Sequence, residues 1–382
     1  MRILMVTSFP IPGEFDGTAM LPIKIIRALR KRGLKVVLAH LRARPPFGQT
    51  EIGDFEGTPT YTLPPSRWVD GLMKIARKHA INIVHAQHYG GATRALPACR
   101  LMRLPMVYEV HSLLGEEFER DRLGRGLKFQ LTKRFEASAC RHAAAVIALG
   151  EPVRDVLVRE KGVPADRVAV IYPGIDLDEY SRSDASAGVD QVGPEHKVVM
   201  YVGSIVHPNQ GVPILIDALP SVFDRVPEAK CVLVGGPAEA GIAYRAQLGS
   251  YGDRLIVLTG RTPEQVVALA RRADVLVHPR LACRENYSVQ SKIAVYLAAG
   301  RPIVATDFGD YTRILGATGA GHLTAVNSGA VADGIVEVLT NPELARSLSA
   351  ACRPVAEEFF SMDRNIERYL DVYGQALAAG PR

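Results

Sequence analysis

Cysteine is scarce in this chain of 382 residues, and its five cysteines are scattered: Cys99, Cys140, Cys231, Cys283 and Cys352. They form no CxxC pair and are odd in number, which argues against a disulfide framework or a cysteine zinc site and favours a reducing compartment. No apolar run reaches the ~18 residues of a membrane-spanning helix. The N-terminal MRILMVTSFPIPG predicts a buried strand rather than a signal peptide. We therefore expect a cytoplasmic protein.

Metal-binding spacing and sequence repeats are also missing. His85 and His88 lie three positions apart beside an expected strand end, but no further ligands follow at metal spacing, so no metal is expected. No period of roughly 20–50 residues recurs, which excludes a solenoid. Hydrophobic residues make up 47% and charged residues 23% of the chain, so we expect a well-packed globular protein with room for two domains.

Short β-rich runs alternate with amphipathic helical stretches, which is the pattern of parallel α/β layers. In the first layer the expected elements are a strand at 3–7, a loop at 13–20, a helix at 21–32, strands at 35–40, 82–86, 105–110 and 143–148, and a long helix at 115–139. A Ser-, Asp-, Gly- and Ala-rich linker is expected at 181–197. The second layer begins with a strand at 198–203 and includes a helix at 243–251, and the last expected helix of the chain spans 363–377.

Much of the formal net charge of +6 comes from one predicted helix, whose cations are Lys24, Arg27, Arg30, Lys31 and Arg32. Such a face is typical of a solvated helix, and cations are favoured near a helix C-terminus. It also suits an anionic membrane surface or an anionic acceptor. Because no nucleic-acid-binding module accompanies the charge, nucleic acid is not expected as a partner.

Two places carry candidate chemistry. Residues 284–307 run from a polar loop through an amphipathic helix that stops at Gly300 and into a buried strand. A loop that leads into a helix N-terminus presents free N–H groups and a positive dipole end, which suit a phosphate or a sugar. His111 ends a predicted parallel strand, and ligands of open α/β sheets collect at the carboxyl ends of strands.

The run SKIAVYLAAGRPIVAT, which begins at Ser291, resembles the donor-site helix of the family-4 retaining glycosyltransferases. Enzymes of that family have the GT-B fold, an α/β architecture with two Rossmann-like domains facing each other across a cleft. On this resemblance, 1–180 is the acceptor domain, a crossing helix at about 363–377 returns to it, and 198–360 is the donor domain.

The resemblance also implies roles for individual residues. His111 corresponds to a histidine near the donor sugar, and Glu285 lies two residues from Tyr287, the position of a family glutamate; these two are the expected catalytic residues. A loop at Gly17 and Thr18 corresponds to the family's Gly-Gly pair. The expected donor-binding residues are Gly17, Thr18, Gly203, Ser204, Gln210, Arg261, Asn286, Tyr287, Ser288, Val289, Lys292 and Val295.

Three positions that are charged in the family are neutral in this chain. Ser204 stands where the family has an arginine and Gln210 where it has a lysine, and both of these cations hold the departing diphosphate. Val295 stands where the family has a second glutamate. Each lost cation is worth on the order of 10²–10³-fold in rate. Groups that could replace them are His207, Arg261, Arg280, Arg284, Lys292 and the N–H groups of 287–289.

We therefore expect a retaining glycosyltransferase that moves a sugar from a nucleotide-sugar donor to a hydroxyl acceptor in polysaccharide, glycolipid or natural-product assembly. The nucleotide sugar is the substrate, and no cofactor is expected. The alternatives are a catalytically altered GT-B protein that acts as a binding or scaffold subunit, and a pseudo-glycosyltransferase or nucleotide-sugar epimerase. The acceptor is expected to be anionic or membrane-associated, which would place the protein in the cytoplasm or peripherally at the inner membrane surface.

Overall fold

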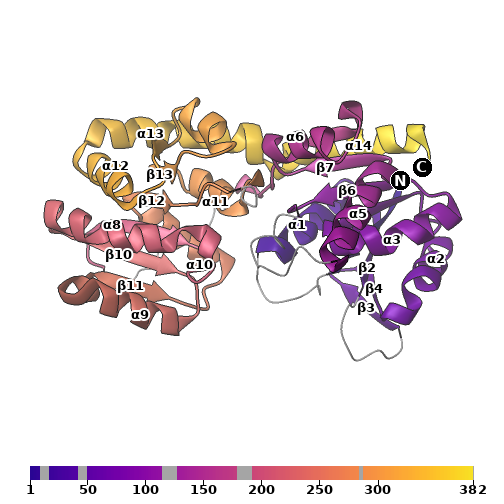
Figure 1. The fold of residues 1–382 in the computed structure, drawn as a ribbon, viewed down its shortest axis with the longest axis horizontal. Coiled ribbons are helices and arrows are strands. Elements are labelled where there is room, and N and C mark those ends of the chain that lie inside the picture. Colours follow the sequence, from indigo (N-terminus) through magenta and orange to yellow (C-terminus); the bar gives the residue numbers. More distant parts are fainter. Residues whose placement is uncertain (9–16, 42–49, 114–126, 179–191, 284–286, 382) are drawn as a thin grey trace. The chain divides into compact units, whose positions relative to one another are not determined.

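The computed structural model describes residues 1–8, 17–41, 50–113, 127–178, 192–283 and 287–381. Two units emerge from its contacts: Met1–Gly174 together with Met362–Arg382 (unit 1), and Ile175–Ser361 (unit 2). Each unit has its own β-sheet with helices packed around it (Figure 1). The expected α/β class with two sheets is confirmed, and the change of unit comes at Gly174, shortly before the expected linker.

Unit 1 contains an eight-stranded sheet in the order β3-β4-β2-β1-β5-β6-β7-β8. Its strands are β1 (Arg2–Thr7), β2 (Lys35–Leu41), β3 (Glu51–Phe55), β4 (Thr58–Leu63), β5 (Ile83–Gln87), β6 (Met106–Val110), β7 (Ala145–Ala148) and β8 (Val168–Val170). All neighbours are parallel except β3 and β4. The direction of winding changes at β1, which has β2 on one side and β5 on the other. Such a switch point opens a crevice at the carboxyl ends of the strands.

The described helices of unit 1 include one from the far end of the chain. They are α1 (Gly17–Lys31), α2 (Trp68–Lys78), α3 (His88–Met102), α5 (Leu127–His142), α6 (Glu151–Arg159) and α14 (Met362–Ala379). The apolar residues of α14 recur at helical spacing, and Ile366, Val372 and Tyr373 are buried in the same core as Ile3 and Met5. Helix α14 therefore packs on α1, β6 and β7 (Figure 1).

The structure of unit 1 differs from the prediction in one loop, at one helix end and in an added hairpin. Helix α1 begins at Gly17, so the predicted loop is wrong for 17–20, while 13–16 lie outside the described residues. Helix α5 begins at Leu127 and continues to His142; the first part of the predicted helix 115–139 also lies outside them. The β3–β4 hairpin was not predicted, because β3 is a mostly exposed edge strand without an apolar alternation. Its two-residue turn has positive φ at both Glu56 (49°) and Gly57 (75°), as a type I′ turn requires.

Unit 2 contains a six-stranded parallel sheet in the order β11-β10-β9-β12-β13-β14. Its strands are β9 (Lys197–Val202), β10 (Ala229–Val234), β11 (Leu255–Leu258), β12 (Val275–His278), β13 (Ile303–Thr306) and β14 (His322–Thr324). The winding changes direction at β9, between β10 and β12. A second crevice is therefore expected at the carboxyl ends of β9 and β12.

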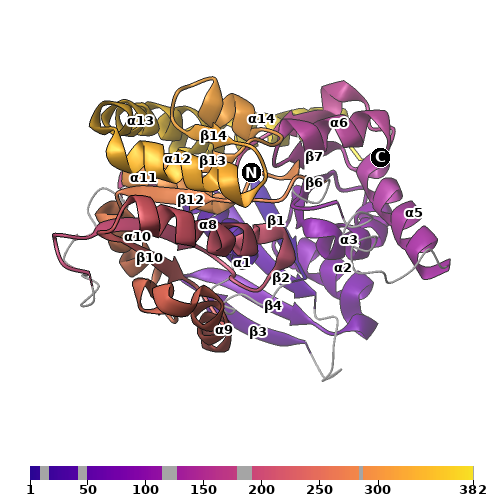
Figure 2. The same ribbon diagram turned by 60° about the vertical axis from the view of Figure 1, so that its left-hand side comes forward.

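The described α-helices of unit 2 include α8 (Val212–Arg225), α9 (Ala238–Leu248), α10 (Pro263–Arg272), α11 (Ser291–Ala299), α12 (Ser328–Thr340) and α13 (Pro342–Val355). Helices α8 and α12 lie side by side over one face of the sheet (Figure 2). As predicted, α11 ends at Gly300, whose φ is +67°. The Asn341 side chain caps α13 by accepting from the N–H groups of Glu343 and Leu344. Helix α9 begins five residues earlier than predicted, directly after Pro237.

Candidate active site

A buried polar cluster lies at the carboxyl ends of β5 and β6 in unit 1, beside the switch point. We call His85, Gln87, Glu109 and His111 the strand-end cluster. Side chains two residues apart on a strand point to the same face, and Gln87 is in register with Glu109 on the neighbouring strand. His85, Gln87 and Glu109 are completely buried, and only 7% of the His111 side chain is exposed. The alternation of the two strands thus gathers four polar side chains in one place.

Glu109 is the centre of the strand-end cluster. Its Oε2 accepts a hydrogen bond from Gln87 Nε2 at 3.1 Å and lies 3.0 Å from His85 Nε2. Its Oε1 lies 3.4 Å from His111 Nε2. Burial by itself would raise the pKa of this carboxyl, but the hydrogen bonds and charges of His111 and His85 outweigh it and hold the pKa well below its usual range. Glu109 is therefore a carboxylate at neutral pH.

His111, the expected catalytic histidine, contacts the rest of the cluster through one ring nitrogen, Nε2. Its Nε2 lies 2.6 Å from the amide oxygen of Gln87. Behind the cluster, the hydroxyl of Tyr373 on α14 lies 2.7 Å from His85 Nδ1. A hydrogen bond therefore joins the chain's last described helix to His85 in the middle of β5.

His88 is a second histidine at this edge of unit 1. It is the first residue of α3 and has φ = +60°, a conformation that non-glycine residues rarely adopt outside functional or over-determined sites. Its ring lies edge-on to that of His111, with centroids 6.2 Å apart. Burial, with the charges of His111 and Arg94, lowers the pKa of His88 to about 3, so this imidazole is neutral.

In unit 2 a lysine reaches the loop that follows β9. Lys292, in the first turn of α11, donates from Nζ to Gln210 Oε1 at 2.7 Å and to the Tyr201 hydroxyl at 2.9 Å. The ammonium also lies 4.4 Å from the centre of the Tyr201 ring. Gly203 has φ = +134°, and a Cβ at this position would overlap Nζ of Lys292. Only glycine fits between β9 and this ammonium.

Positive charge is concentrated around Lys292, and we call Lys292, Gln210, Arg280 and His278 the lysine group. Burial and then the charge of Arg280 hold the pKa of Lys292 well below its usual range, and the two groups that accept its hydrogen bonds are neutral. His278, at the end of β12, is buried edge-on against Tyr311, with ring centroids 4.8 Å apart. Burial, Lys292 and Arg280 also lower the pKa of His278. Within the described part of the chain, neither ring nitrogen of His278 has a hydrogen-bond partner.

The loop before α11 carries further unpaired polar atoms. The Ser288 hydroxyl and Gln290 Oε1 are buried without a hydrogen-bond partner among the described residues. Tyr287 stacks on Phe308, with ring centroids 5.8 Å apart and 26° between the planes. Val289 is buried, so only its backbone can face a ligand. These groups lie directly before the N-terminus of α11, where the helix dipole favours negative charge.

The remaining expected donor-site residues are placed as follows. The Ser204 hydroxyl accepts from His207 N–H at 3.3 Å, and Val295 lies half-buried one turn after Lys292. Arg261 is exposed between β11 and α10, with no described contact to the lysine group. In unit 1, Gly17 and Thr18 form the first turn of α1. Glu285 and Asn286 lie outside the described residues.

Sequence reasoning did not identify four of the residues that build these sites: Gln87, Glu109, Tyr201 and His278. The signal for Glu109 was present, because a residue two positions before His111 on a strand shares its face. Gln87 stands in the same relation to His85. Tyr201 and His278 gave no signal beyond their position near strand ends.

The basic face of α1 is partly neutralised within unit 1. Arg27 Nε donates to Glu56 at 2.9 Å, Arg32 pairs with Glu367, and Lys31 lies 3.7 Å from Asp363. Three of the five cations thus have carboxylate partners inside the fold.

Of the described helices, none is long and apolar enough to cross a membrane.

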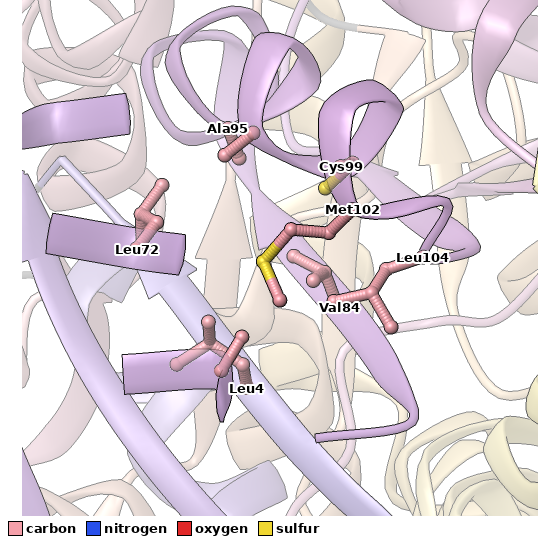
Figure 3. A pocket seen from close by; sticks show the side chains of 9 residues that line it. Leu4, Leu72, Val84, Ala95, Cys99, Met102 and Leu104 are labelled. Carbon is pink, nitrogen blue, oxygen red and sulfur yellow. The ribbon is translucent and has the colours of Figure 1, made fainter. Parts of the chain in front are cut away.

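A small cavity in unit 1 is not a candidate for sugar binding. It lies among Leu4, Leu72, Val84, Cys99 and Met102, whose side chains point into it (Figure 3). This lining is almost entirely apolar and offers no group to orient a hydroxyl.

For metals, the described part of the chain holds no group of three His, Cys, Asp or Glu side chains that could bind an ion.

Two family descriptions match successive parts of the chain. Residues 15–179 match Glycosyltransferase Family 4, and residues 196–341 match Glycosyl transferases group 1. The chain thus carries a family-4 glycosyltransferase domain followed by a group-1 glycosyl transferase domain. The first segment contains β2 to β8 of unit 1 and the second contains all six strands of the unit 2 sheet; the strand-end cluster and the lysine group lie within them.

Curated relatives of this glycosyltransferase include two bacterial enzymes. The phosphatidyl-myo-inositol mannosyltransferase of Mycobacterium leprae is 30% identical over 47% of this chain and 46% of its own length, so the match spans about half of that relative. The D-inositol 3-phosphate glycosyltransferase of Corynebacterium glutamicum is 24% identical over 81% of each chain.

Solved glycosyltransferase structures show the same fold over nearly the whole chain. HepE from Anabaena, in complex with UDP, has a TM-score of 0.78 at 21% identity and covers 98% of this chain and 100% of its own. The sucrose-phosphate synthase of Thermosynechococcus elongatus has a TM-score of 0.79 at 18% identity, with 99% and 100% covered. The expected GT-B architecture is confirmed at the level of the fold.

Proposed function

We propose that this protein is a retaining glycosyltransferase that uses a nucleotide-sugar donor, and that Lys292 supplies the cation that holds the donor diphosphate. The observation that carries the proposal is the position of the Lys292 ammonium, 2.7 Å from Gln210, the residue at which the family has its lysine. The positive charge that is missing from the loop after β9 is thus provided from α11.

The electrostatics of the lysine group support an anionic ligand. Arg280 disfavours protonation of Lys292, both cations disfavour protonation of His278, and burial is the larger cause in each case. A diphosphate would relieve that repulsion, accept hydrogen bonds from Lys292 and meet the N-terminus of α11. A scaffold subunit that binds no substrate would gain nothing from keeping a lysine in this costly position. The lysine group therefore favours an enzyme over a scaffold subunit.

We further propose an anionic polyol as the hydroxyl acceptor, bound at the strand-end cluster of unit 1. The names of the two relatives each contain an inositol that carries a phosphate. In this chain Arg94 lies near His88 at the same sheet edge, and burial lowers the pKa of its guanidinium without removing its charge. Because part of the basic face of α1 is paired internally, a small anionic acceptor is favoured over a membrane surface.

The test has a binding arm and a reaction arm. Calorimetric titration with UDP, GDP and ADP should give a complex with one of them, and Lys292→Met should weaken it about 10-fold or more, the worth of a hydrogen bond to a charged group. Lys197→Met is the matched control, because Lys197 lies at the opposite end of β9 and pairs with Asp274. Incubation with the corresponding nucleotide hexoses and an inositol phosphate should give a product with retained anomeric configuration by NMR. Absence of binding to every nucleotide would refute the proposal.

A further inference from the structure

The strand-end cluster determines which nitrogen of His111 carries the proton. Glu109 is a carboxylate and can only accept hydrogen bonds, so the Gln87 atom 3.1 Å from its Oε2 must be the amide nitrogen. The amide oxygen of Gln87 therefore faces His111, at 2.6 Å from Nε2. Since that oxygen also only accepts, Nε2 of His111 must be the N–H.

The other nitrogen of His111 is then unprotonated in the neutral ring. No described residue hydrogen-bonds Nδ1, whereas Nε2 faces two oxygens, those of Gln87 and Glu109. The fixed tautomer leaves the Nδ1 lone pair as a hydrogen-bond acceptor at the carboxyl edge of the sheet. In an Asp–His pair the same arrangement keeps the imidazole in its working tautomer, and removal of the carboxylate charge yields the wrong one.

We propose that Glu109 and Gln87 are positioning residues that fix His111 as the Nε2-protonated tautomer and leave His111 Nδ1 as the hydrogen-bond acceptor at this edge of unit 1. The effect on sugar transfer rests on the proposed function; the tautomer does not. Glu109 acts through Gln87 and through its own contact with His111. The titratable groups around His111 are Glu109 and His85 from the two strands and His88 from α3, and Tyr373 of α14 lies behind His85.

The tautomer can be measured without substrate. In protein labelled with ¹⁵N-histidine, with His111 assigned by its loss in His111→Asn, spectra at about pH 8.5, two units above the ordinary histidine pKa, should show a protonated Nε2 and an unprotonated Nδ1. In Glu109→Gln the His111 ring should become a mixture of its two tautomers. The neutral amide at position 109 can hydrogen-bond to either the nitrogen or the oxygen of the Gln87 amide, so the orientation of Gln87 is no longer fixed. The matched control is Glu136→Gln, which neutralises another buried carboxylate of unit 1, the partner of Lys161 at 2.7 Å.

The reaction provides the second measurement. In the sugar-transfer assay, Glu109→Gln should lower kcat about 10-fold, the worth of one ordinary hydrogen bond, and leave the KM for the nucleotide sugar within about 2-fold. Glu136→Gln should leave both constants unchanged.

The outcomes separate the inference from the proposed function. A wild-type His111 with its proton on Nδ1 overturns the inference, even where Glu109→Gln fails to fold. An unchanged tautomer and kcat in Glu109→Gln overturn it as well. A wild-type protein with the expected tautomer and no sugar transfer would instead refute the proposed function and leave the tautomer assignment standing.

Discussion

The ammonium of Lys292 donates to the amide oxygen of Gln210 across 2.7 Å, from the first turn of α11 to the loop after β9. In the family that this sequence resembles, the cation belongs to the position of Gln210. A lysine side chain about 6 Å long can serve one point in space from either segment, because the two segments meet at the switch point of the sheet. The location of a charge can thus be kept while its position in the sequence changes.

A charge swap tests this relationship. Gln210→Lys alone should lower the thermal stability of unit 2, because it brings a second ammonium within about 3 Å of Lys292 in a partly buried place. Lys292→Gln alone should weaken nucleotide binding. The double variant Gln210→Lys/Lys292→Gln should recover most of both properties, and calorimetry with the nucleotide measures the coupling. Additive losses in the double variant would contradict the exchange.

Lys292 should cost folding stability in the absence of a ligand. Its pKa is lowered in the folded state, so the unfolded chain binds more protons between that lowered pKa and the ordinary value of about 10.4. In this window the stability of the wild type rises with pH, by about 1.4 kcal/mol in total for each unit of pKa shift. Lys292→Met should therefore unfold at a higher temperature at pH 7, with the advantage shrinking towards pH 10. Calorimetric scans measure this difference in unfolding temperature, with Lys197→Met as the control. A Lys292→Met protein less stable than wild type at pH 7 would contradict the prediction.

Nucleotide binding should take up a proton at Lys292. The diphosphate stabilises the ammonium and raises the lowered pKa, so the fraction of protonated lysine increases on binding. Titrations at about pH 8.5, two units above the ordinary histidine pKa, in buffers of different ionisation heat would reveal the uptake. Lys292→Arg keeps the charge but cannot titrate in this range. Equal proton uptake by both proteins would assign the proton to another group.

The sequence specified the strands and the ends of the helices better than it specified the sites. Gly33, Gly300 and Asn341 mark helix boundaries through local backbone chemistry that a sequence displays directly. The contact of Lys292 with Gln210 joins segments 82 residues apart, and that of Tyr373 with His85 joins segments 288 residues apart. Such pairs follow from sheet order, which local patterns do not encode.

The hydrogen bond between Tyr373 and His85 should contribute more stability than a similar bond on the same unit. Tyr373→Phe removes the hydroxyl 2.7 Å from the fully buried His85 Nδ1 and leaves that nitrogen without water to replace it, at a cost of about 1–3 kcal/mol. Tyr61→Phe is the matched control: its hydroxyl lies 2.8 Å from Nε2 of the partly exposed His79, where water can substitute. Trp68 is the one tryptophan of the chain and lies in unit 1, so its fluorescence during urea unfolding reports on this unit. The urea midpoint of unfolding should fall further for Tyr373→Phe than for Tyr61→Phe, because burial rather than bond length determines the loss of stability. Equal shifts would show that water reaches His85 and that α14 does not seal the strand-end cluster.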